Sequence, residues 1–431
     1  MFTNEADVLR YVEENDVKFI RMSFCDIHGN VKNLSVIDSE LATAFRDGVP
    51  ISGEAIDGFM GAEDSYLRLF PDPKTLTVMP WRPQRGKVIR LFCDIKRADG
   101  SPYEYDVRRT LKNTAKKLAE YGIGCSVGIE SEFYLFETDQ NGDPTRIPQD
   151  KAGYFDIAPL DKGENVRREI CLSLEEMGLK PISSHHEKGP GQNEIDFRRR
   201  NAFKAAENCV LFKSTVQTIA ASNGLFASFY PKPLADHCGN GLAFKLMLTK
   251  DGVQNVMGEN GSITDTAAAF AAGILDRAAE ITCFTNPSVA SFDRLSGDDA
   301  PSYIGWSRGN HGQCIRLTSS SADAADIEVR WPDATCNPFL ALTLIIEAGL
   351  EGIKMSKTLP VPFDAANADN FARLPHDLET AIRLSKESQF VRSALTAGLA
   401  ESYISASQRE WERFSAYPDK AGYLDKVFKA L

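Results

Sequence analysis

The stretch GIESEFYLF, residues 128–136, limits the possible folds more than any other feature of the chain. Side chains of a β-strand point alternately to the two faces of its sheet, so Glu130 and Glu132 share one face. The apolar Ile129 and Phe133 share the other. Two carboxylates this close repel each other unless a metal cation, a basic side chain or a raised pKa neutralises them. The spacing leaves these possibilities open, together with a simple exposed face of an antiparallel sheet.

The composition excludes several classes of protein. The 431 residues are enough for two or more domains, and 60 acidic against 49 basic residues argue against a nucleic-acid-binding or membrane-surface protein. The longest apolar stretches, such as residues 341–353, are too short or too interrupted to span a bilayer. The chain shows no signal peptide and no CxxC pair among its nine cysteines, so we expect free thiols and a cytoplasmic location.

Hydrophobic periodicity and turn residues predict an α+β fold of two domains. Residues 17–36 form a predicted hairpin that turns at Gly29, and a β-rich N-terminal domain ends near residue 103. The remainder alternates helices with strands, which favours an antiparallel sheet over a doubly wound one. The other main strands are predicted at residues 75–81, 87–95, 225–233, 242–250 and 326–331, and the main helices at residues 4–15, 107–121, 166–178, 201–224, 266–282 and 337–353.

Three further glutamates lie in similar settings. Glu187 precedes the Gly-Pro-Gly turn at 189–191 and Glu194 follows it, so two flanking strands would bring both acids together. Glu328 lies two residues before Arg330 in the last predicted strand. Five such glutamates suit Mg²⁺ or Mn²⁺, which prefer oxygen ligands and, in pairs, serve phosphoryl transfer from ATP. The sequence contains no P-loop and no dinucleotide-binding glycine motif after a strand.

Five long motifs occur in a fixed order, and together they closely resemble the glutamine synthetases of the bacterial type. The motifs are GIESEFYLF, GYFDIAPLDKGENVRREI, SSHHEKGPGQNEIDF, FTNPSVASFDRL and EVRWPDATCNPFLAL, and the resemblance covers nearly the whole chain. It implies an N-terminal β-grasp domain, residues 1–103, and a catalytic domain, residues 104–431, built on an antiparallel sheet with helices. It also implies a homo-oligomer, a dodecamer of two stacked hexameric rings, with active sites between neighbouring subunits.

The activity implied by the resemblance is an ATP-dependent ligation. ATP would phosphorylate the γ-carboxylate of glutamate or an analogue, and ammonia or another amine would displace the phosphate. By motif, Glu132, Glu187 and Glu194 match the first site for Mg²⁺ or Mn²⁺. Glu130 and Glu328 match ligands of a second site, which bridges the nucleotide. Two or more metal ions per active site are therefore expected.

The resemblance also assigns the substrate-binding residues. Arg294 matches the arginine that holds the substrate α-carboxylate, a task suited to a guanidinium fork. Gly239 matches the glycine that contacts the substrate amino group. Arg316 matches an arginine for substrate and nucleotide phosphate, and Arg330 matches the catalytic arginine beside the transferring phosphoryl group.

Several active-site positions depart from the family. The histidine that completes the second metal site is replaced by Ala243, and the next nucleotide-facing position is Lys245. An arginine before the EVR motif is replaced by Asp326, and the aromatic residue that stacks on adenine aligns with Arg199. The flap glutamate that takes a proton from the amine aligns with the shorter Asp299, which we expect to be catalytic.

The departures leave two main functions open. The first is a ligase that joins glutamate, or a close analogue, to ammonia or another amine. The family aspartate of the ammonium site aligns with Ser52, which argues against ammonia as the ordinary acceptor. The second is a catalytically degenerate homologue that acts as a regulatory or ligand-binding subunit. A purely structural ring protein is a third hypothesis, which the five retained glutamates disfavour because unpaired buried acids are costly.

Overall fold

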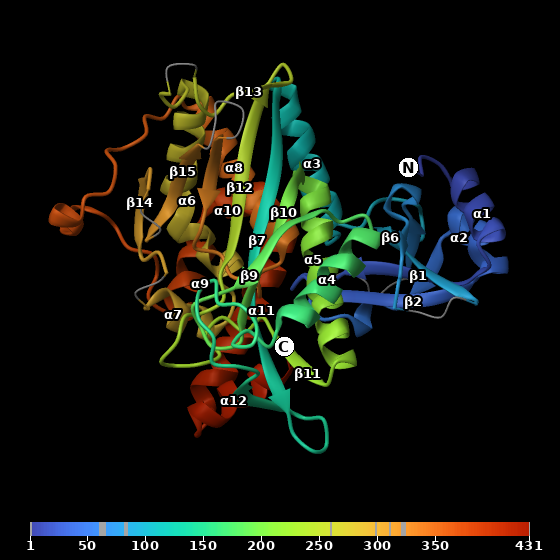
Figure 1. Cartoon of the computed structure of the whole chain (residues 1–431). Coiled ribbons are helices and arrows are strands. Elements are labelled where there is room, and N and C mark those ends of the chain that lie inside the picture. The colour runs from blue at the N-terminus through green and yellow to red at the C-terminus, as the bar shows by residue number, and fades with distance from the viewer. Residues whose placement is uncertain are drawn as a thin grey trace.

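The computed structural model describes residues 2–59, 66–81, 85–258, 261–297, 300–309, 312–319 and 325–430. Within them, a small N-terminal sheet domain lies beside a larger domain built on one long sheet with helices (Figure 1). This arrangement confirms the predicted α+β class. Among the described residues, none of the helices is long and apolar enough to cross a membrane.

The N-terminal domain is a mixed sheet with two short helices. β1 (Val17–Cys25) pairs antiparallel with β2 (Val31–Ile37), which confirms the predicted hairpin, and runs parallel to β6 (Lys87–Lys96). The sheet continues through β4 (Leu67–Pro71) to β3 (Val49–Ile51), and β5 (Thr77–Val78) pairs with β6. The helical segments here are α1 (Glu5–Glu14), η1 (Asp38–Glu40), α2 (Leu41–Asp47), η2 (Gly53–Ala55) and η3 (Pro73–Thr75).

The large sheet positions the acidic residues. Its order is β14 (Tyr303–Ser307), β15 (Gln313–Ser319), β16 (Ala325–Val329), β12 (Leu242–Lys250), β7 (Ile123–Thr138), β10 (Gln192–Asn201) and β9 (Pro181–His186). β8 (Pro144–Pro148) and β11 (Leu225–Ser228) also pair with β7, and β13 (Val253–Gln254) pairs with β12. Neighbours are antiparallel apart from the parallel pair of β14 and β15, which confirms the expected sheet type.

Helices of the large domain pack on this sheet or on one another. They are α3 (Val107–Glu120), α4 (Glu164–Glu176), α5 (Ala202–Ser222), α6 (Asp265–Thr285), α7 (Val289–Leu295), α8 (Pro338–Lys354), η4 (Ala365–Asn370), α9 (Leu378–Glu387), α10 (Gln389–Leu395), α11 (Ala397–Ala416) and α12 (Lys420–Ala430). α3 and α5 pack on β7, and α6 packs on β14 and β15. α8 begins where its sequence predicts, because the Asn337 side chain accepts bonds from two backbone N–H groups and a proline follows.

β7 has the two faces that its sequence predicts. Ile129 and Phe133 are buried, and the Phe133 ring packs edge-on against Phe212 of α5 at a centroid distance of 6.0 Å. Glu130 and Glu132 lie on the opposite face, where a cavity opens. The hydrophobic core therefore fixes the strand, and the strand fixes the direction of both carboxylates.

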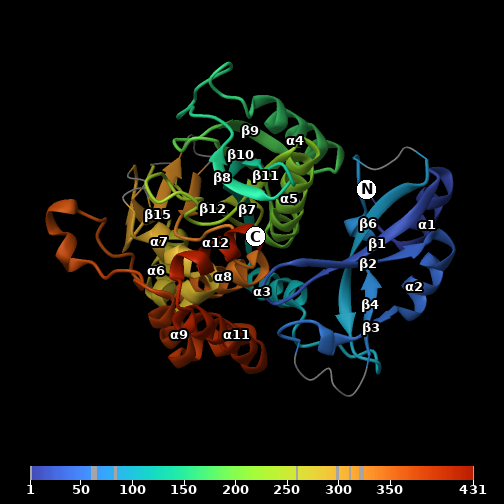
Figure 2. The ribbon, with the colours of Figure 1, turned by 90° about the horizontal axis from the view of Figure 1, so that it is seen from below.

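Buried polar contacts join the two domains, with α3 between them (Figure 2). Arg108 of α3 is 1% exposed, and its guanidinium lies 2.6 Å from Glu207 of α5 and 2.9 Å from Asp94 of β6. Asn337 donates to the Ile27 carbonyl at 2.9 Å. These contacts fix the N-terminal sheet against the large domain, while the domain boundary near residue 103 stays a prediction.

Candidate functional site

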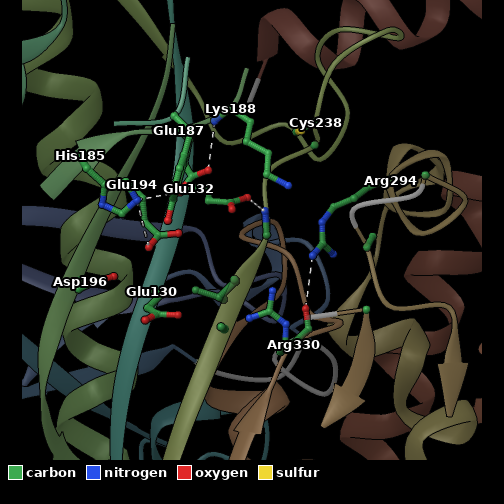
Figure 3. A pocket seen from close by; sticks show the side chains of 18 of the residues that line it. Glu130, Glu132, His185, Glu187, Lys188, Glu194, Asp196, Cys238, Arg294 and Arg330 are labelled. Atoms are coloured by element: carbon green, nitrogen blue, oxygen red, sulfur yellow. Dashed lines mark hydrogen bonds and ion pairs between the residues drawn. The ribbon is translucent and has the colours of Figure 1, made fainter. Parts of the chain in front are cut away.

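A cavity of about 860 Å³ opens on the acidic face of the large sheet. Acidic side chains from β7, from β10 and from the turn that follows β9 form one wall, and Arg294 and Arg330 lie across the cavity from them (Figure 3). The acids are Glu130, Glu132, Glu187, Glu194 and Asp196, and the basic residues are Lys188, Lys232, Arg294, Arg316 and Arg330. A cavity with this division of charge can hold cations on one side and an anionic substrate on the other.

The pairing of β7, β10 and β9 brings the predicted ligands of the first metal site close together. Glu132 of β7 lies opposite Glu194 of β10, which lies opposite His185 of β9. The imidazole Nε2 of His185 is 2.8 Å from Glu187 Oε1 and 4.0 Å from Glu194 Oε1. The turn at 189–191 thus brings Glu187 and Glu194 together, as the sequence predicts.

This cluster fits a divalent ion. Burial raises the pKa of Glu132, and the Glu187 carboxylate raises it further, against the opposing bond from the Gly241 N–H. Burial and then the Glu132 carboxylate also raise the pKa of Glu194. Such carboxyls hold protons that a bound cation displaces. Three carboxylates with one imidazole, whose His185, Glu187 and Glu194 ligand atoms lie within 4.8 Å of one another, suit Mg²⁺ or Mn²⁺.

Sequence reasoning missed two residues of this wall. His185 lies two residues before Glu187, and Asp196 lies two residues after Glu194. The alternation that identified Glu130 and Glu132 applies equally to these pairs, so the signal was present. Asp196 lies opposite Glu130 and accepts a hydrogen bond from the Ser183 hydroxyl.

The predicted ligands of the second metal site have a different environment. Ala243 lies directly opposite Glu130 and offers no ligand atom. Lys245, two residues further along β12, forms an ion pair with Glu130. Burial lowers the pKa of this lysine, and the carboxylate of Glu328, opposite it on β16, opposes that shift.

Two arginines surround Glu328. This fully buried carboxylate accepts a bond from Arg316 Nε at 2.7 Å and forms an ion pair with Arg330 through its other oxygen. Both arginines line the cavity. With Ala243 in place of a ligand, a lysine on Glu130 and two arginines on Glu328, no divalent ion fits between Glu130 and Glu328. On its other side, the Glu130 carboxylate lies within 4.8 Å of ligand atoms of Glu194 and Asp196.

Arg294 of α7 lies at the other end of the cavity (Figure 3). Its guanidinium donates to the carbonyls of Trp331 at 2.9 Å, Pro332 at 3.2 Å and Arg330 at 3.3 Å. These bonds fix the plane of the guanidinium beside the cavity.

The turn of residues 238–241 packs against this arginine. A Cβ atom on Gly239 would lie 2.3 Å from the Pro231 carbonyl oxygen, and one on Gly241 would lie 2.8 Å from Arg294 Nη2. Position 239 therefore requires glycine, and a side chain at position 241 would displace the Arg294 guanidinium from its place. Asp236 and His237, which precede the turn, are exposed and do not line the cavity.

Two departures from the family bind each other. Arg199 of β10 and Asp326 of β16 form a two-pronged ion pair, in which Nε lies 2.8 Å from Oδ1. The arginine crosses over Gly128 of β7, which has no side chain to obstruct it. The aspartate that replaces a family arginine at position 326 is thus neutralised by the arginine that replaces a family aromatic residue at position 199.

The remaining predicted positions lie elsewhere. Asp299 lies outside the described residues. Ser52 and Glu54 belong to the N-terminal domain and do not line the cavity of their own chain. All nine cysteines are free, as expected.

Comparisons with known proteins give matches along most of the chain. The family model "Glutamine synthetase, beta-Grasp domain" matches residues 16–98, and "Glutamine synthetase, catalytic domain" matches residues 104–423. Glutamine synthetases of Clostridium saccharobutylicum and Methanosarcina mazei are each 40% identical, over 425 and 427 residues, which cover 96% of this chain and 96% and 95% of theirs. A solved GmaS–ADP complex is similar with a TM-score of 0.87 and 26% identity, covering 98% of this chain and 99% of that one. These matches confirm the predicted β-grasp and catalytic domains.

Proposed function

The chain belongs to the glutamine synthetase family, and from that premise we propose that it is an ATP-dependent ligase that joins glutamate, or a close analogue, to an amine. The observation that carries this proposal is the cluster of Glu132, Glu187, Glu194 and His185 opposite cavity-lining arginines. Buried carboxylates without a counter-ion are costly to a fold, so their presence supports a bound cation.

The acidic wall would hold the metal. Glu132, Glu187 and Glu194, with His185, would bind Mg²⁺ or Mn²⁺. A bound divalent ion supplies the positive charge that polarises a carboxylate or phosphoryl oxygen. The chain itself holds these ligands in place, because each is fixed by strand register and by the turn at 189–191.

The basic wall would hold the substrates. Arg294, fixed by three carbonyls, would bind the α-carboxylate of glutamate, with Gly239 leaving room for the amino group. A γ-carboxylate oxygen would attack the terminal phosphorus of ATP, releasing ADP and forming γ-glutamyl phosphate. Arg330 and Arg316 would offset the charge that develops on the phosphoryl group. The amine would then displace phosphate, and Asp299 would accept its proton.

The acceptor side would come from a neighbouring subunit. Ser52 and Glu54 lie away from the cavity of their own chain, which is the placement expected if each site is completed in a dodecamer of two hexameric rings. With Ser52 in place of an aspartate, an amine larger than ammonia would be the ordinary acceptor. The free thiols support a cytoplasmic location.

Calorimetric titration of ATP into the protein with Mn²⁺ tests the proposal. The wild type should bind ATP more tightly with the metal than without it, and Glu132→Ala should lose that gain. Glu137→Ala is the matched control, because Glu137 is exposed on the same strand and should change nothing. A mass-spectrometric screen of glutamate with a panel of amines should then find one γ-glutamyl amide. No amide with any amine would count against the ligase.

One observation, the alanine at position 243, favours a second function. Ala243 removes a ligand from the nucleotide end of the site, as expected of a homologue that has lost catalysis and acts as a regulatory or ligand-binding subunit. That function predicts no amide product in the same screen, together with co-purification of an active synthetase.

A further inference from the structure

A lysine ammonium lies beside the cavity, paired with Glu130, which lines it. β12 lies between β7, which carries Glu130, and β16, which carries Glu328. Lys245 of β12 is the cross-strand partner of Glu328 and forms an ion pair with Glu130. The side chains of Lys245 and Glu130 are only 27% and 17% exposed, so this pair is partly shielded from water.

The residues next to Lys245 in the sheet leave it room to reach Glu130. Its cross-strand partner on β7 is Gly128, and a Cβ atom there would touch the Lys245 Cβ at 3.5 Å. This is an ordinary van der Waals distance, so Gly128 does not obstruct the lysine, which reaches Glu130. Ala243, opposite Glu130, is too short to compete for the carboxylate.

Glu328, the other predicted ligand of the second metal site, already has two arginines as counter-ions. Glu328 has one oxygen bonded to Arg316, at 2.7 Å from Nε and 2.6 Å from the terminal nitrogen, and the other paired with Arg330. A divalent ion between Glu130 and Glu328 would therefore have to displace an arginine and also lie beside the Lys245 ammonium. Like charges this close repel each other strongly where the site is partly shielded from water.

We propose that the Lys245 ammonium takes the place of the second divalent cation, so that each active site binds one metal ion fewer than its five glutamates indicate. The ammonium, together with Arg316 and Arg330, then faces the phosphates of ATP. The role towards ATP rests on the proposed function, whereas the number of metal ions does not. The first site, at Glu132, Glu187 and Glu194, is unaffected.

Counting bound Mn²⁺ per chain tests this inference. Equilibrium dialysis with elemental analysis, with and without ADP, compares the wild type with an Ala243→His/Lys245→Ser variant. The double variant removes the ammonium and adds an imidazole opposite Glu130, so it should bind one more Mn²⁺ per chain. Glu132→Ala should lose one ion from both backgrounds.

Glu130→Ala provides a second, independent test. In the wild-type background it should leave the Mn²⁺ count unchanged, because Glu130 holds a lysine there. In the double variant it should remove the added ion. Loss of one Mn²⁺ from the wild type on Glu130→Ala would overturn the inference, as would a folded double variant that gains none.

The two proposals fail separately. If the counts behave as expected and no amide product forms with any amine, the lysine substitution stands and the ligase function falls. If the amide forms and Glu130→Ala costs the wild type one ion, the ligase stands and the role of Lys245 is wrong. Should the double variant not fold, the Glu130→Ala count in the wild type decides the matter alone.

Discussion

At the scale of single residues, the first metal site is a set of buried carboxyl groups, and in the metal-free protein their burial and mutual repulsion cost folding free energy. Burial and mutual repulsion raise the pKa values of Glu132 and Glu194. The imidazole of His185, on the neighbouring strand β9, lies 2.8 Å from Glu187 and 4.0 Å from Glu194. Removing one of these acids should therefore relieve repulsion in the metal-free protein and weaken metal binding at the same time.

Glu132→Ala should separate these two effects. Its metal-free melting temperature should equal or exceed that of the wild type, because one buried like-charge contact is gone. Its stabilisation by Mn²⁺ should be lost, and ligase turnover should fall by more than about 100-fold, since even residues behind metal ligands contribute 10–100-fold. Thermal unfolding with and without Mn²⁺ measures the first two, and Glu137→Ala is the control. A Glu132→Ala protein that Mn²⁺ still stabilises as strongly as the wild type would contradict the assignment.

The same raised pKa values predict a pH dependence. A carboxyl whose pKa is raised on folding binds more protons in the folded state, so metal-free stability is lost as pH rises above the unfolded value of 4.5. A metal ion replaces those protons, so its stabilising effect should grow with pH. The increment in melting temperature given by Mn²⁺ should thus increase from about pH 5 to about pH 9. An increment that stays flat over this window would show that the carboxyls are already ionised without metal.

At the scale of secondary-structure elements, local sequence correctly predicted features that depend on a single strand. Period-two alternation placed Glu130 and Glu132 on one face of β7, and β12 has the predicted bounds. The predicted strand at 225–233 was too long, because β11 ends at Ser228 and the chain then runs through prolines that cannot join a ladder. Contacts between strands that are not neighbours in sequence were beyond such reasoning.

The ion pair of Arg199 and Asp326 is the clearest contact that the sequence did not predict, because it joins strands that are far apart in the chain. The alignment with the family counts them as two separate losses from a nucleotide site, whereas the sheet order brings them together across β7 and β12. Because Asp326 is 6% exposed in this pair, each partner alone is costly. A double-mutant cycle of Arg199→Ala and Asp326→Ala should give a coupling energy of about 1–3 kcal/mol in denaturant unfolding. Arg198→Ala, at an exposed neighbouring position, should show no coupling with Asp326→Ala; equal coupling for both arginines would contradict a specific pair.

At the scale of the whole molecule, the two domains depend on a buried arginine. Arg108 links Asp94 of the N-terminal sheet to Glu207 of the large domain. Arg108→Ala would leave Glu207, 1% exposed, with Lys204 as its remaining partner among the described ion pairs. We expect a loss of about 3 kcal/mol in the free energy of unfolding. Arg109→Ala, one residue along and exposed, should stay within about 0.5 kcal/mol of the wild type. Similar losses in both variants would show that Arg108 acts only through helix stability.

The sequence motifs supplied the family, the domain architecture and most of the acidic wall, because each motif is long and local. They did not supply the ion pair of Lys245 with Glu130 or the two arginines on Glu328, since these contacts depend on which strands lie side by side. Substitutions that look like losses in an alignment can therefore be parts of a rebuilt site.

The most direct test of the proposed ligase follows one oxygen atom. Glutamate labelled with ¹⁸O in its γ-carboxylate is incubated with ATP, Mn²⁺ and the amine found in the screen, and the released phosphate is analysed by mass spectrometry. Transfer of the phosphoryl group to that carboxylate, followed by displacement, predicts one ¹⁸O atom in each phosphate and one retained in the amide. Unlabelled phosphate would mean that ATP is hydrolysed by water, and would contradict a ligase that works through γ-glutamyl phosphate.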